Sequence, residues 1–562
     1  MIAAVHSATL TGTTGRPVVV EVHDSGGLPG FTIVGLPDTA VRESRDRVRA
    51  ALLSSTFGWP QRRMTVNLAP TAVRKAGAGL DLPIALGVLA AVGDLSWKAL
   101  EGVAFIGELG LDGSVRHVPG TIALAEAVRG QRLVVPECDL AEAAAVRPRR
   151  TFGVPSLRTL VEILRGTRPW PPSVTNGVLG RADERADRHG NGSAAAAEQR
   201  AWIERAVACY GDLEEVKGQR VGRRAVEVAA SGGHHLLLVG PPGSGKTMLA
   251  RRLVGLLPPL ARPEALEVTR IHSSAGLSAR EGGLVWDPPF RAPHHGASAV
   301  SLVGGGTASM RPGEISLASR GVLFLDEMGE FPAAVLDALR QPLEEGVVRV
   351  SRARGTAEFP ARFLLVGAMN PCPCGEGGAS GSCRCSPAAR ARYVRRLSGP
   401  LLDRFDLVVP LRRTAPDELL SPASGEPTAA VATRVVAARR LARTRGVRCN
   451  SELRASMLSA VAPLDSGAAQ LLERSVRAGR LSGRGVDRVR RVARTIADLD
   501  LAVAGAVTAA VAGAVAVAGA GAVTAAGAGA VAVAGAGSIV KEEHVAEALA
   551  LRAGREVLDV GG

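Results

Sequence analysis

Short apolar runs alternate with amphipathic stretches along most of this chain, and the pattern predicts a mixed α/β protein. Near the start, Val18–Val22 and Met64–Leu68 have the apolar and β-branched character of strands. Between them, Asp38–Ser54 carries apolar residues at helical spacing. Residues 1–168 are therefore expected to form an α+β domain.

Three apolar runs farther along the chain each end in a chemically distinctive segment. His234–Val239 precedes a glycine-rich loop, Gly321–Leu325 precedes two acidic residues, and Phe363–Met369 precedes an asparagine. Apolar runs of this length are typical of buried strands. The residues that follow these strands are the first candidates for a functional site.

The glycine-rich loop matches the pattern GxxxxGK[ST], which binds nucleoside triphosphates when a strand precedes it and a helix follows. Here the helix is predicted from Met248 to about Leu257. Backbone N–H groups of such a loop bind the phosphates, the lysine adds a positive charge, and the threonine hydroxyl ligates Mg²⁺. The sequence therefore predicts a site for ATP and Mg²⁺ formed by Gly240, Pro241, Pro242, Gly243, Ser244, Gly245, Lys246 and Thr247.

The motifs after this loop follow the order of the AAA+ ATPases, and the chain resembles that superfamily. Asp326 and Glu327 resemble the Walker B pair, in which the first acid holds Mg²⁺ and the second activates the attacking water. Asn370 matches sensor 1, a polar residue that contacts this water or the γ-phosphate. Arg404 matches the arginine finger. A neighbouring subunit supplies that finger, so the resemblance implies a ring.

The same resemblance gives two further assignments. Arg484 begins a predicted helix that runs through Arg494, and it matches sensor 2 of the AAA+ lid. Arg488, one turn later, is the competing choice, and a solvated arginine face would explain both residues without a catalytic role. The segment Val216–Gln219 is expected to form the pocket for the adenine base.

The resemblance also implies the fold, a parallel sheet with helices on both faces in residues 201–412 and a helical lid in residues 431–562. The segments 169–200 and 413–430 are predicted to be linkers. An uncharged Ala/Val/Gly/Thr run at 501–537 interrupts the lid. It is as long as a membrane span, but alanine and glycine are barely apolar, so an expanded insert without membrane contact is predicted.

In the front domain, Ala72–Leu86 and Gly107–Val115 resemble the peptidase domain of Lon-type proteases, an S5-like fold. That family pairs a serine nucleophile with a lysine, which must lie within hydrogen-bond reach of each other. The corresponding positions here are Gly79 and Ile122. The resemblance therefore implies a non-catalytic relative, with no peptidase activity.

Two insertions narrow the resemblance. Residues 290–316 lie between the Walker motifs, and a predicted hairpin within Val347–Phe363 precedes sensor 1. Together with Asn370–Gly375 and Arg396–Arg404, they resemble the magnesium-chelatase-like AAA+ proteins of the ComM/YifB type over nearly the whole chain. The resemblance implies a cytoplasmic homo-hexameric ATPase that encircles branched or single-stranded DNA and drives branch migration.

The charge distribution is compatible with DNA as a partner. The formal net charge is +15, and residues 431–500 contain fifteen arginines against six acids. Such a segment attracts phosphate backbones, but solvated helix faces in an arginine-rich chain would give the same count. Aromatic residues make up only 3%, which argues against a single-strand reader built on base stacking. The hairpin arginines, which could equally be solvated, are the predicted DNA contacts: Arg349, Arg352 and Arg354.

Four of the seven cysteines lie in one loop, residues 371–386. As thiolates they would suit tetrahedral zinc that staples the loop, and a metal-free loop is the alternative; they are Cys372, Cys374, Cys383 and Cys385. The cysteines form no disulfide framework, and Met1–His6 lacks a signal-peptide pattern, so the cytoplasm is expected. His294 and His295 are expected to be structural, because adjacent histidines project in different directions.

Three functions use machinery of this kind. They are a DNA translocase or branch-migration helicase, a chelatase motor that inserts a metal into a tetrapyrrole, and an ATPase that remodels protein. The chelatase interpretation requires a porphyrin-binding partner subunit, and nothing in this chain resembles one. The basic hairpin and the Lon-like front domain favour DNA.

Overall fold

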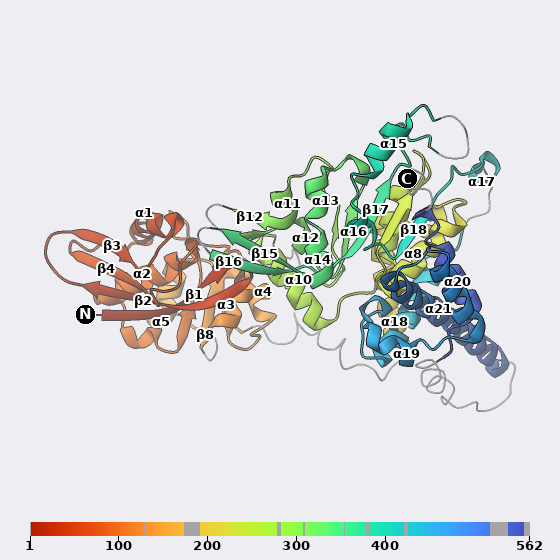
Figure 1. Ribbon diagram of the computed structural model, residues 1–562. Coiled ribbons are helices and arrows are strands. Elements are labelled where there is room, and N and C mark those ends of the chain that lie inside the picture. Colours follow the sequence, from red (N-terminus) through yellow and green to blue (C-terminus); the bar gives the residue numbers. More distant parts are fainter. Residues whose placement is uncertain are drawn as a thin grey trace.

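The computed structural model describes residues 2–128, 131–173, 192–277, 283–306, 310–352, 355–377, 383–420, 425–517 and 538–555. Along the chain they form a front α/β domain, a central α/β core and a helical lid (Figure 1). The predicted α/β class is thereby confirmed.

The front domain is built on a seven-stranded mixed sheet. The strands predicted at Val18–Val22 and Met64–Leu68 are confirmed as parts of its second and fourth strands along the chain. The spatial order is β3 (Gly30–Val34), β4 (Arg63–Ala69), β2 (Thr14–Asp24), β1 (Ile2–Thr11), β5 (Val103–Phe105), β8 (Arg132–Pro136) and β9 (Thr151–Val154). β1 and β2 form a long antiparallel hairpin, whereas β1, β5, β8 and β9 run parallel to one another.

Helix α2 is the centre of the front domain, since every one of its residues is buried. It packs on β1, β2 and α1, and α1 follows the N-cap Asp38, whose carboxylate accepts a hydrogen bond from the Val41 N–H at 2.9 Å. The helices are α1 (Thr39–Ser54), α2 (Asp81–Ala91), α3 (Thr121–Ala127), α4 (Leu140–Ala144) and α5 (Leu157–Leu164), and the short strands β6 (Glu108–Leu109) and β7 (Val115–Arg116) form a small hairpin.

The central core contains a five-stranded parallel sheet. Its spatial order is β11 (Phe290–Arg291), β14 (Val322–Leu325), β17 (Leu364–Met369), β10 (Leu236–Val239) and β18 (Leu407–Pro410). Alternate residues of these strands enter two separate apolar clusters, one on each face of the sheet. This is why the three strands predicted here are apolar along their whole length.

Helices cover both faces of this sheet, as the resemblance implies. The helices of this region are α7 (Gly192–Tyr210), α8 (Arg220–Gly232), α9 (Lys246–Gly255), α10 (Arg262–Ser274), α11 (Ala299–Val303), α12 (Glu314–Leu317), α13 (Ala333–Asp337), α14 (Arg340–Glu345), α15 (Pro387–Val394), α16 (Gly399–Leu402) and α17 (Pro416–Leu420). Two antiparallel pairs accompany them, β12 (Gly304–Gly305) with β13 (Arg311–Pro312), and β15 (Val347–Arg352) with β16 (Gly355–Pro360). Both predicted linkers contain helix, because α7 and α17 begin inside them.

The lid consists of α18 (Thr428–Thr444), α19 (Leu458–Val461), α20 (Ser466–Arg477), α21 (Gly483–Val517) and α23 (Glu542–Ala550). Helix α21 does not end at Asp500 as expected. It continues through residues 501–517, because alanine has the highest helix propensity and the packed first half of the helix supplies the nucleus. The remainder of the insert, residues 518–537, lies outside the described residues. Within the described ranges, no helix has the length and apolar character to cross a membrane.

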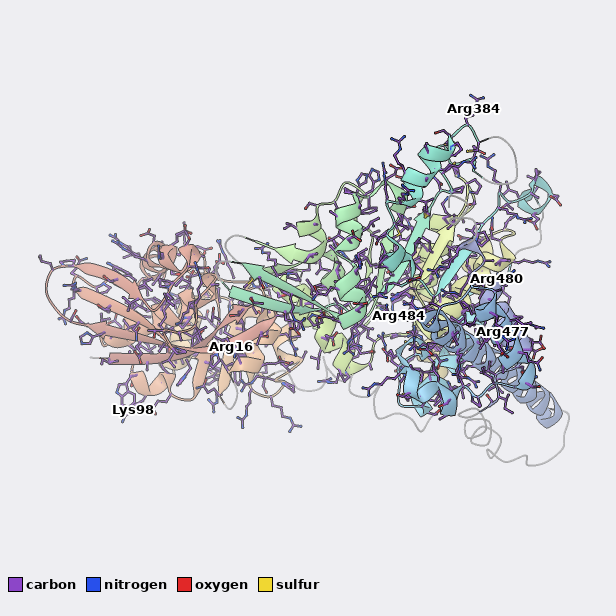
Figure 2. The ribbon with its side chains drawn as sticks, viewed as in Figure 1. Arg16, Lys98, Arg384, Arg477, Arg480 and Arg484 are labelled. Atoms are coloured by element: carbon purple, nitrogen blue, oxygen red, sulfur yellow. The ribbon has the colours of Figure 1, made fainter. Side chains whose placement is uncertain are left out.

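Several of the lid arginines are buried. The basic segment was expected either to attract phosphate backbones or to form solvated helix faces, and neither explanation predicts buried arginines. Arg445 and Arg494 both pair with Asp498, at 2.6 and 2.9 Å, and all three side chains are buried. Others donate to backbone carbonyls: Arg439, Arg490 and Arg491. Exposed basic side chains lie around the turn between α20 and α21, where Figure 2 labels Arg477, Arg480 and Arg484.

The front domain contacts the core in two places. At the first, α3 and α4 pack on α10, where the Gly120 N–H donates to the Ser273 carbonyl at 3.0 Å and the Ser273 hydroxyl donates to buried Glu142. At the second, the β1–β2 turn at Gly12 lies against Ala357 of β16, as the direction of the hairpin in Figure 1 suggests. The hairpin that precedes β17 is therefore in contact with the front domain.

Candidate functional site

The predicted phosphate-binding loop joins β10 to α9, the strand–loop–helix arrangement that the motif requires. Two of its glycines have left-handed backbones, with φ of 75° at Gly243 and 82° at Gly245. Other residues rarely adopt this conformation, so glycine is needed at both positions. The loop thus opens directly onto the N-terminus of α9.

Lys246 connects this loop to the end of the neighbouring strand β17. Its ammonium group donates to the carbonyls of Gly240 and Pro241, at 2.7 and 2.9 Å, and to Oδ1 of Asn370 at 3.1 Å. Burial lowers the pKa of Lys246, while the nearby carboxylates of Asp326 and Glu327 act in the opposite direction. The predicted P-loop lysine and sensor 1 asparagine are therefore in direct contact.

The two predicted magnesium ligands also lie together. The Thr247 hydroxyl donates to Oδ2 of Asp326 at 2.8 Å, and the other carboxylate oxygen of Asp326 accepts from the Glu327 N–H at 2.9 Å. Because β10 and β14 are parallel, the residues after them meet at one edge of the sheet. Hydroxyl and carboxylate oxygens are ligands that Mg²⁺ prefers.

Glu327 has a partner that the sequence analysis missed. Its Oε2 lies 3.1 Å from Nδ1 of His295, which comes from the insertion between the Walker motifs and whose ring is tilted against that of His294, with 4.0 Å between the ring centroids. The sequence gives no signal for this contact beyond the histidine pair itself. The contact depends on how the insertion packs against the core, and the sequence does not reveal that packing.

The expected adenine pocket lies at the same edge of the sheet. Val216 is buried in the cluster that contains Leu249 of α9, and the Gln219 amide donates to the Arg412 carbonyl just beyond β18. The Leu411 N–H in turn donates to the Val239 carbonyl at 2.7 Å, immediately before the P-loop. The structure thus brings this segment beside the loop, and its role in binding the adenine base stays a prediction.

The arginines predicted as finger and sensor 2 lie at the opposite edge. Asp406, two residues after Arg404, exchanges hydrogen bonds with the backbone of His235, at the start of β10. Arg488 reaches the same carboxylate at 3.9 Å. At about 3.3 Å per strand residue, the path from His235 to Gly240 separates the two edges by roughly 16 Å. The structure therefore does not bring these arginines to the P-loop of their own chain.

Arg404 lines a basic cavity of about 640 Å³ at this opposite edge. It pairs with Glu344, and its Nε is buried without a hydrogen-bond partner among the described residues. Burial lowers the pKa of Arg404, and so does the charge of Arg488, Arg484 and Arg340. Of the two sensor 2 candidates, Arg488 lines the cavity, whereas Arg484 is exposed beside it. Further arginines in the lining are Arg443, Arg454 and Arg491.

The hairpin before β17 carries the predicted DNA contacts. Arg349 is exposed but already paired, with Glu345 at 2.5 Å and with Glu358 at 3.2 Å. Arg352 is described only as the last residue of β15, and Arg354 lies outside the described residues. Phosphate binding by Arg349 would have to compete with its two carboxylate partners.

The four clustered cysteines converge on one point. Their sulfur atoms all lie within 4.8 Å of one another, and the separations are 3.3 Å for Cys372–Cys374 and 3.6 Å from Cys383 to each of these two. Four thiolates at about 2.3 Å from a tetrahedral zinc ion would be about 3.8 Å apart. The donor set, with Cys385 as the fourth sulfur, therefore fits zinc.

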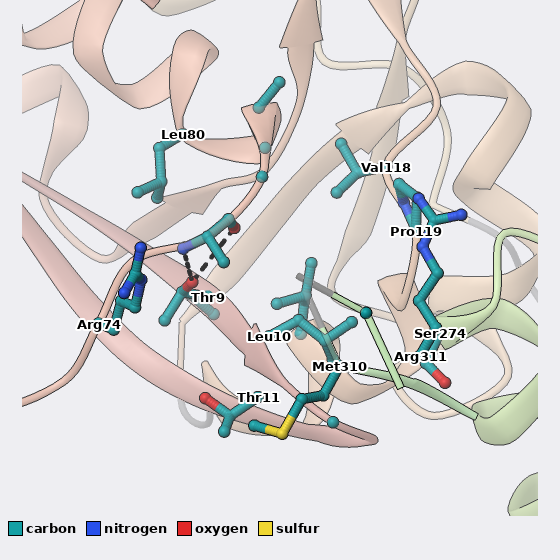
Figure 3. Close-up of a pocket in the computed structure, with 18 of the residues that line it drawn as sticks. Thr9, Leu10, Thr11, Arg74, Leu80, Val118, Pro119, Ser274, Met310 and Arg311 are labelled. Carbon is teal, nitrogen blue, oxygen red and sulfur yellow. Dashed lines mark hydrogen bonds between the residues drawn. The ribbon is translucent and has the colours of Figure 1, made fainter. Parts of the chain in front are cut away.

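Gly79 and Ile122, the positions that the Lon resemblance matched to the serine and the lysine, both have apolar surroundings. A side-chain carbon on Gly79 would come within 2.8 Å of Val118, and Ile122 is fully buried in α3. Gly79 borders a cavity of about 730 Å³ between the front domain and the first insertion, which contribute Thr9 and Met310 respectively (Figure 3). The described residues that line this cavity include no lysine, histidine or cysteine.

Comparison with known proteins covers all three regions. Family models for magnesium chelatase, subunit ChlI, match residues 212–419, those for subunit ChlI of Mg-chelatase match 20–139, and those for the ChlI C-terminal region match 425–516. An uncharacterised protein of Mycobacterium tuberculosis is 44% identical over 500 residues, which is 88% of this chain and 94% of the relative.

Two named relatives align over the same extent. The Escherichia coli protein YifB is 42% identical over 504 residues, and the competence protein ComM of Haemophilus influenzae is 40% identical over 502 residues. Each alignment covers 89% of this chain and 94% of the relative. With the P-loop geometry described above, these matches show that the chain belongs to the magnesium-chelatase-like AAA+ ATPases of the ComM/YifB family.

Proposed function

We propose that this protein is an ATP-driven ring motor that acts on DNA, a helicase or translocase that promotes branch migration. The observation that carries the proposal is the meeting of the Lys246–Asn370 and Thr247–Asp326 pairs at one edge of the parallel sheet. The family assignment supports the use of ATP and Mg²⁺. One relative is named a competence protein, which is compatible with work on incoming DNA during natural transformation.

In the proposed cycle, the P-loop N–H groups and Lys246 bind the β- and γ-phosphates, and Thr247 and Asp326 hold Mg²⁺. Glu327 activates the attacking water, and Asn370 orients that water or the γ-phosphate. Because Lys246 now donates to Asn370, ATP binding would exchange this contact for phosphate oxygens and free the amide for its role.

A homo-hexameric ring is proposed because one chain has an incomplete site. The basic cavity around Arg404 faces away from its own P-loop, and a triphosphate from a neighbouring subunit has the charge to occupy it. Arg404 would then stabilise the transferring phosphoryl group in trans, with Arg488 or Arg484 acting from the lid.

Two alternatives use the same motor. A chelatase-type motor subunit is the first, since the family models carry that name, but it would need a partner that holds the tetrapyrrole. Remodelling of protein is the second. Both predict an ATPase that ignores DNA, so ATP turnover measured with single-stranded, duplex and branched DNA separates them from the proposed function.

We further propose that the front domain is a non-catalytic relative of the Lon-type peptidase domain, and that the cysteine loop binds Zn²⁺. Closure of the Gly79 position supports the first proposal, and peptide hydrolysis by the purified protein would contradict it. The sulfur separations support the second. Bound zinc would join the two halves of the loop without taking part in ATP hydrolysis.

Removing the charged groups of the P-loop edge should separate binding from hydrolysis. Lys246→Ala should lose ATP binding, because the loop then lacks the ammonium group, now held on the carbonyls of Gly240 and Pro241, that would pair with the phosphates. Glu327→Gln should bind ATP but hydrolyse it at least ~100-fold more slowly, because the amide cannot accept the proton of the water. Fluorescent-nucleotide titration and phosphate release measure the two effects. Normal turnover by Glu327→Gln would refute its assignment.

His295 is expected to act as a positioning residue for Glu327. His295→Ala should lower ATP turnover at least ~10-fold while ATP affinity stays unchanged, because the carboxylate loses the imidazole contact that orients it. His295→Asn keeps a side-chain donor and should recover part of the turnover. The matched control is His294→Ala, which removes the neighbouring ring but not the contact. Equal turnover for all three variants and the wild type would eliminate this role.

Mixed rings test whether Arg404 acts in trans. Arg404→Ala should bind ATP yet fail to hydrolyse it, and mixing it with Lys246→Ala should restore part of the activity. Some interfaces of such rings pair an intact P-loop with an intact arginine. Mixing Lys246→Ala with Glu327→Gln is the control, because every P-loop edge is then defective. If confirmed mixed rings show no difference between these two mixtures, Arg404 is not a trans-acting finger.

The hairpin charges should set DNA affinity. Replacing Arg349, Arg352 and Arg354 by alanine should weaken binding equally across sequences and reduce the slope of log affinity against log salt, by up to about 0.9 per lost phosphate contact. Glu345→Gln with Glu358→Gln should strengthen binding, because both partners of Arg349 lose their charge.

Fluorescence anisotropy over a salt series measures both hairpin effects. Lys98→Ala serves as the control, since this lysine is exposed on the front domain, far along the chain from the hairpin (Figure 2). Wild-type DNA affinity and salt slope in the triple-arginine variant would rule out the hairpin as the DNA contact.

A further inference from the structure

The cysteine cluster reaches the nucleotide site through three contacts that its position in the sequence does not reveal. Two of them involve the turn that begins at Cys372, and the third involves α15, which begins directly after Cys385 and its N-cap Ser386. The loop therefore touches both the Walker A and the Walker B side of the site.

The first contact is between the cysteine turn and the P-loop. Gly375 has φ of 81°, and a side-chain carbon there would lie 2.7 Å from Cδ of Pro242 and 3.9 Å from the Asn370 amide carbon. The turn is closed by the Gly375 N–H, which donates to the Cys372 carbonyl at 3.0 Å, and by the Gly377 N–H, which donates to the Cys372 sulfur at 3.1 Å. The backbone of this turn thus lies directly against the phosphate-binding loop.

The second contact runs through Asn370. This residue lies two positions before the fully buried Cys372, and its Oδ1 accepts the Lys246 ammonium at 3.1 Å. A displacement of Cys372 would move the end of β17 and therefore the partner of Lys246. The metal ligand and the candidate sensor 1 residue are separated by a single proline.

The third contact joins α15 to the segment that follows Glu327. A side-chain carbon on Gly329 would lie 2.3 Å from the Tyr393 ring, and the Arg396 guanidinium donates to the Gly329 carbonyl at 2.7 Å. Cys383 and Cys385 fix the start of this helix. The cysteine cluster therefore connects the turn at Gly375, which contacts the Walker A loop, to helix α15, which contacts the segment after the Walker B acids.

We propose that Zn²⁺ bound by Cys372, Cys374, Cys383 and Cys385 clamps these two parts of the loop together and thereby holds the P-loop in its nucleotide-binding form. The proposal rests on the proposed function in requiring that this site binds ATP. Zinc has no redox chemistry and a closed four-thiolate site leaves no open position, so the ion would act on geometry alone. Loss of the ion would release Gly375 from Pro242 and lower nucleotide affinity.

The test combines metal content with nucleotide binding. Elemental analysis of the purified wild type should find one zinc per chain, and Cys383→Ser with Cys385→Ser should lose it and bind a fluorescent ATP analogue about 10-fold more weakly. Neither cysteine is among the residues proposed to bind nucleotide. Cys209→Ser, which changes an exposed cysteine outside the cluster, should keep both the zinc and the affinity.

Two further measurements guard against simple misfolding of the cysteine variant. Wild-type protein treated with a zinc chelator should lose affinity, and Zn²⁺ alone, not additional Mg²⁺, should restore it. Gly375→Ala should retain zinc but bind ATP more weakly, because the added methyl group meets Pro242. This variant separates the metal from the contact that transmits its effect.

The outcomes are distinguishable. Wild-type protein without zinc would overturn the metal site, and a zinc-free variant or chelated wild type with unchanged ATP affinity would overturn the clamp. If wild type holds zinc but binds no ATP analogue, the proposed ATPase site itself fails.

Discussion

The parallel alignment of β10, β14 and β17 is the constraint on which the nucleotide site depends. Their carboxyl ends meet at one edge of the sheet. Lys246 and Thr247 of the P-loop therefore form hydrogen bonds with Asn370 and Asp326 respectively, although these residues are far apart along the chain. Each strand is buried on both faces, which fixes its register and leaves only the residue after its end free for chemistry. The insertions and the cysteine loop are arranged around this edge.

The same sheet separates the candidate arginines from the candidate phosphate site. The strand length holds Arg404 and Arg488 at the amino edge, while the phosphates would lie at the carboxyl edge. Burial lowers the pKa of Arg404 even though it pairs with Glu344 and the cavity lining contains acids as well as arginines.

The arginine excess of the lid overstates the positive charge on its surface, because several of these arginines are buried. The side chains of Arg445 and Arg494 are buried, and both form ion pairs with Asp498 inside the lid. Neither is exposed to solvent or available to nucleic acid. Removing one member of such a buried group leaves an uncompensated charge, so these arginines are expected to matter for folding. The positive surface available to DNA is accordingly smaller than the sequence suggests.

The sequence by itself determined the strands, the P-loop, the acidic pair and the family, because these depend on local patterns: apolar runs, glycines at left-handed positions and motifs at fixed spacing. It also placed the four cysteines in one loop. Only the tertiary structure decided which side chains meet. His295 on Glu327 and Gly375 on Pro242 join segments whose separation along the chain carries no distance information. The carboxylates on Arg349 are closer along the chain, one four residues before it and the other opposite it in the hairpin. The buried lid arginines were missed for a related reason, since packing against neighbouring helices, not composition, decides whether an arginine is buried or solvated. The helix through residues 501–517 was missed because it continues from the packed helix before it, which alanine propensity alone does not reveal.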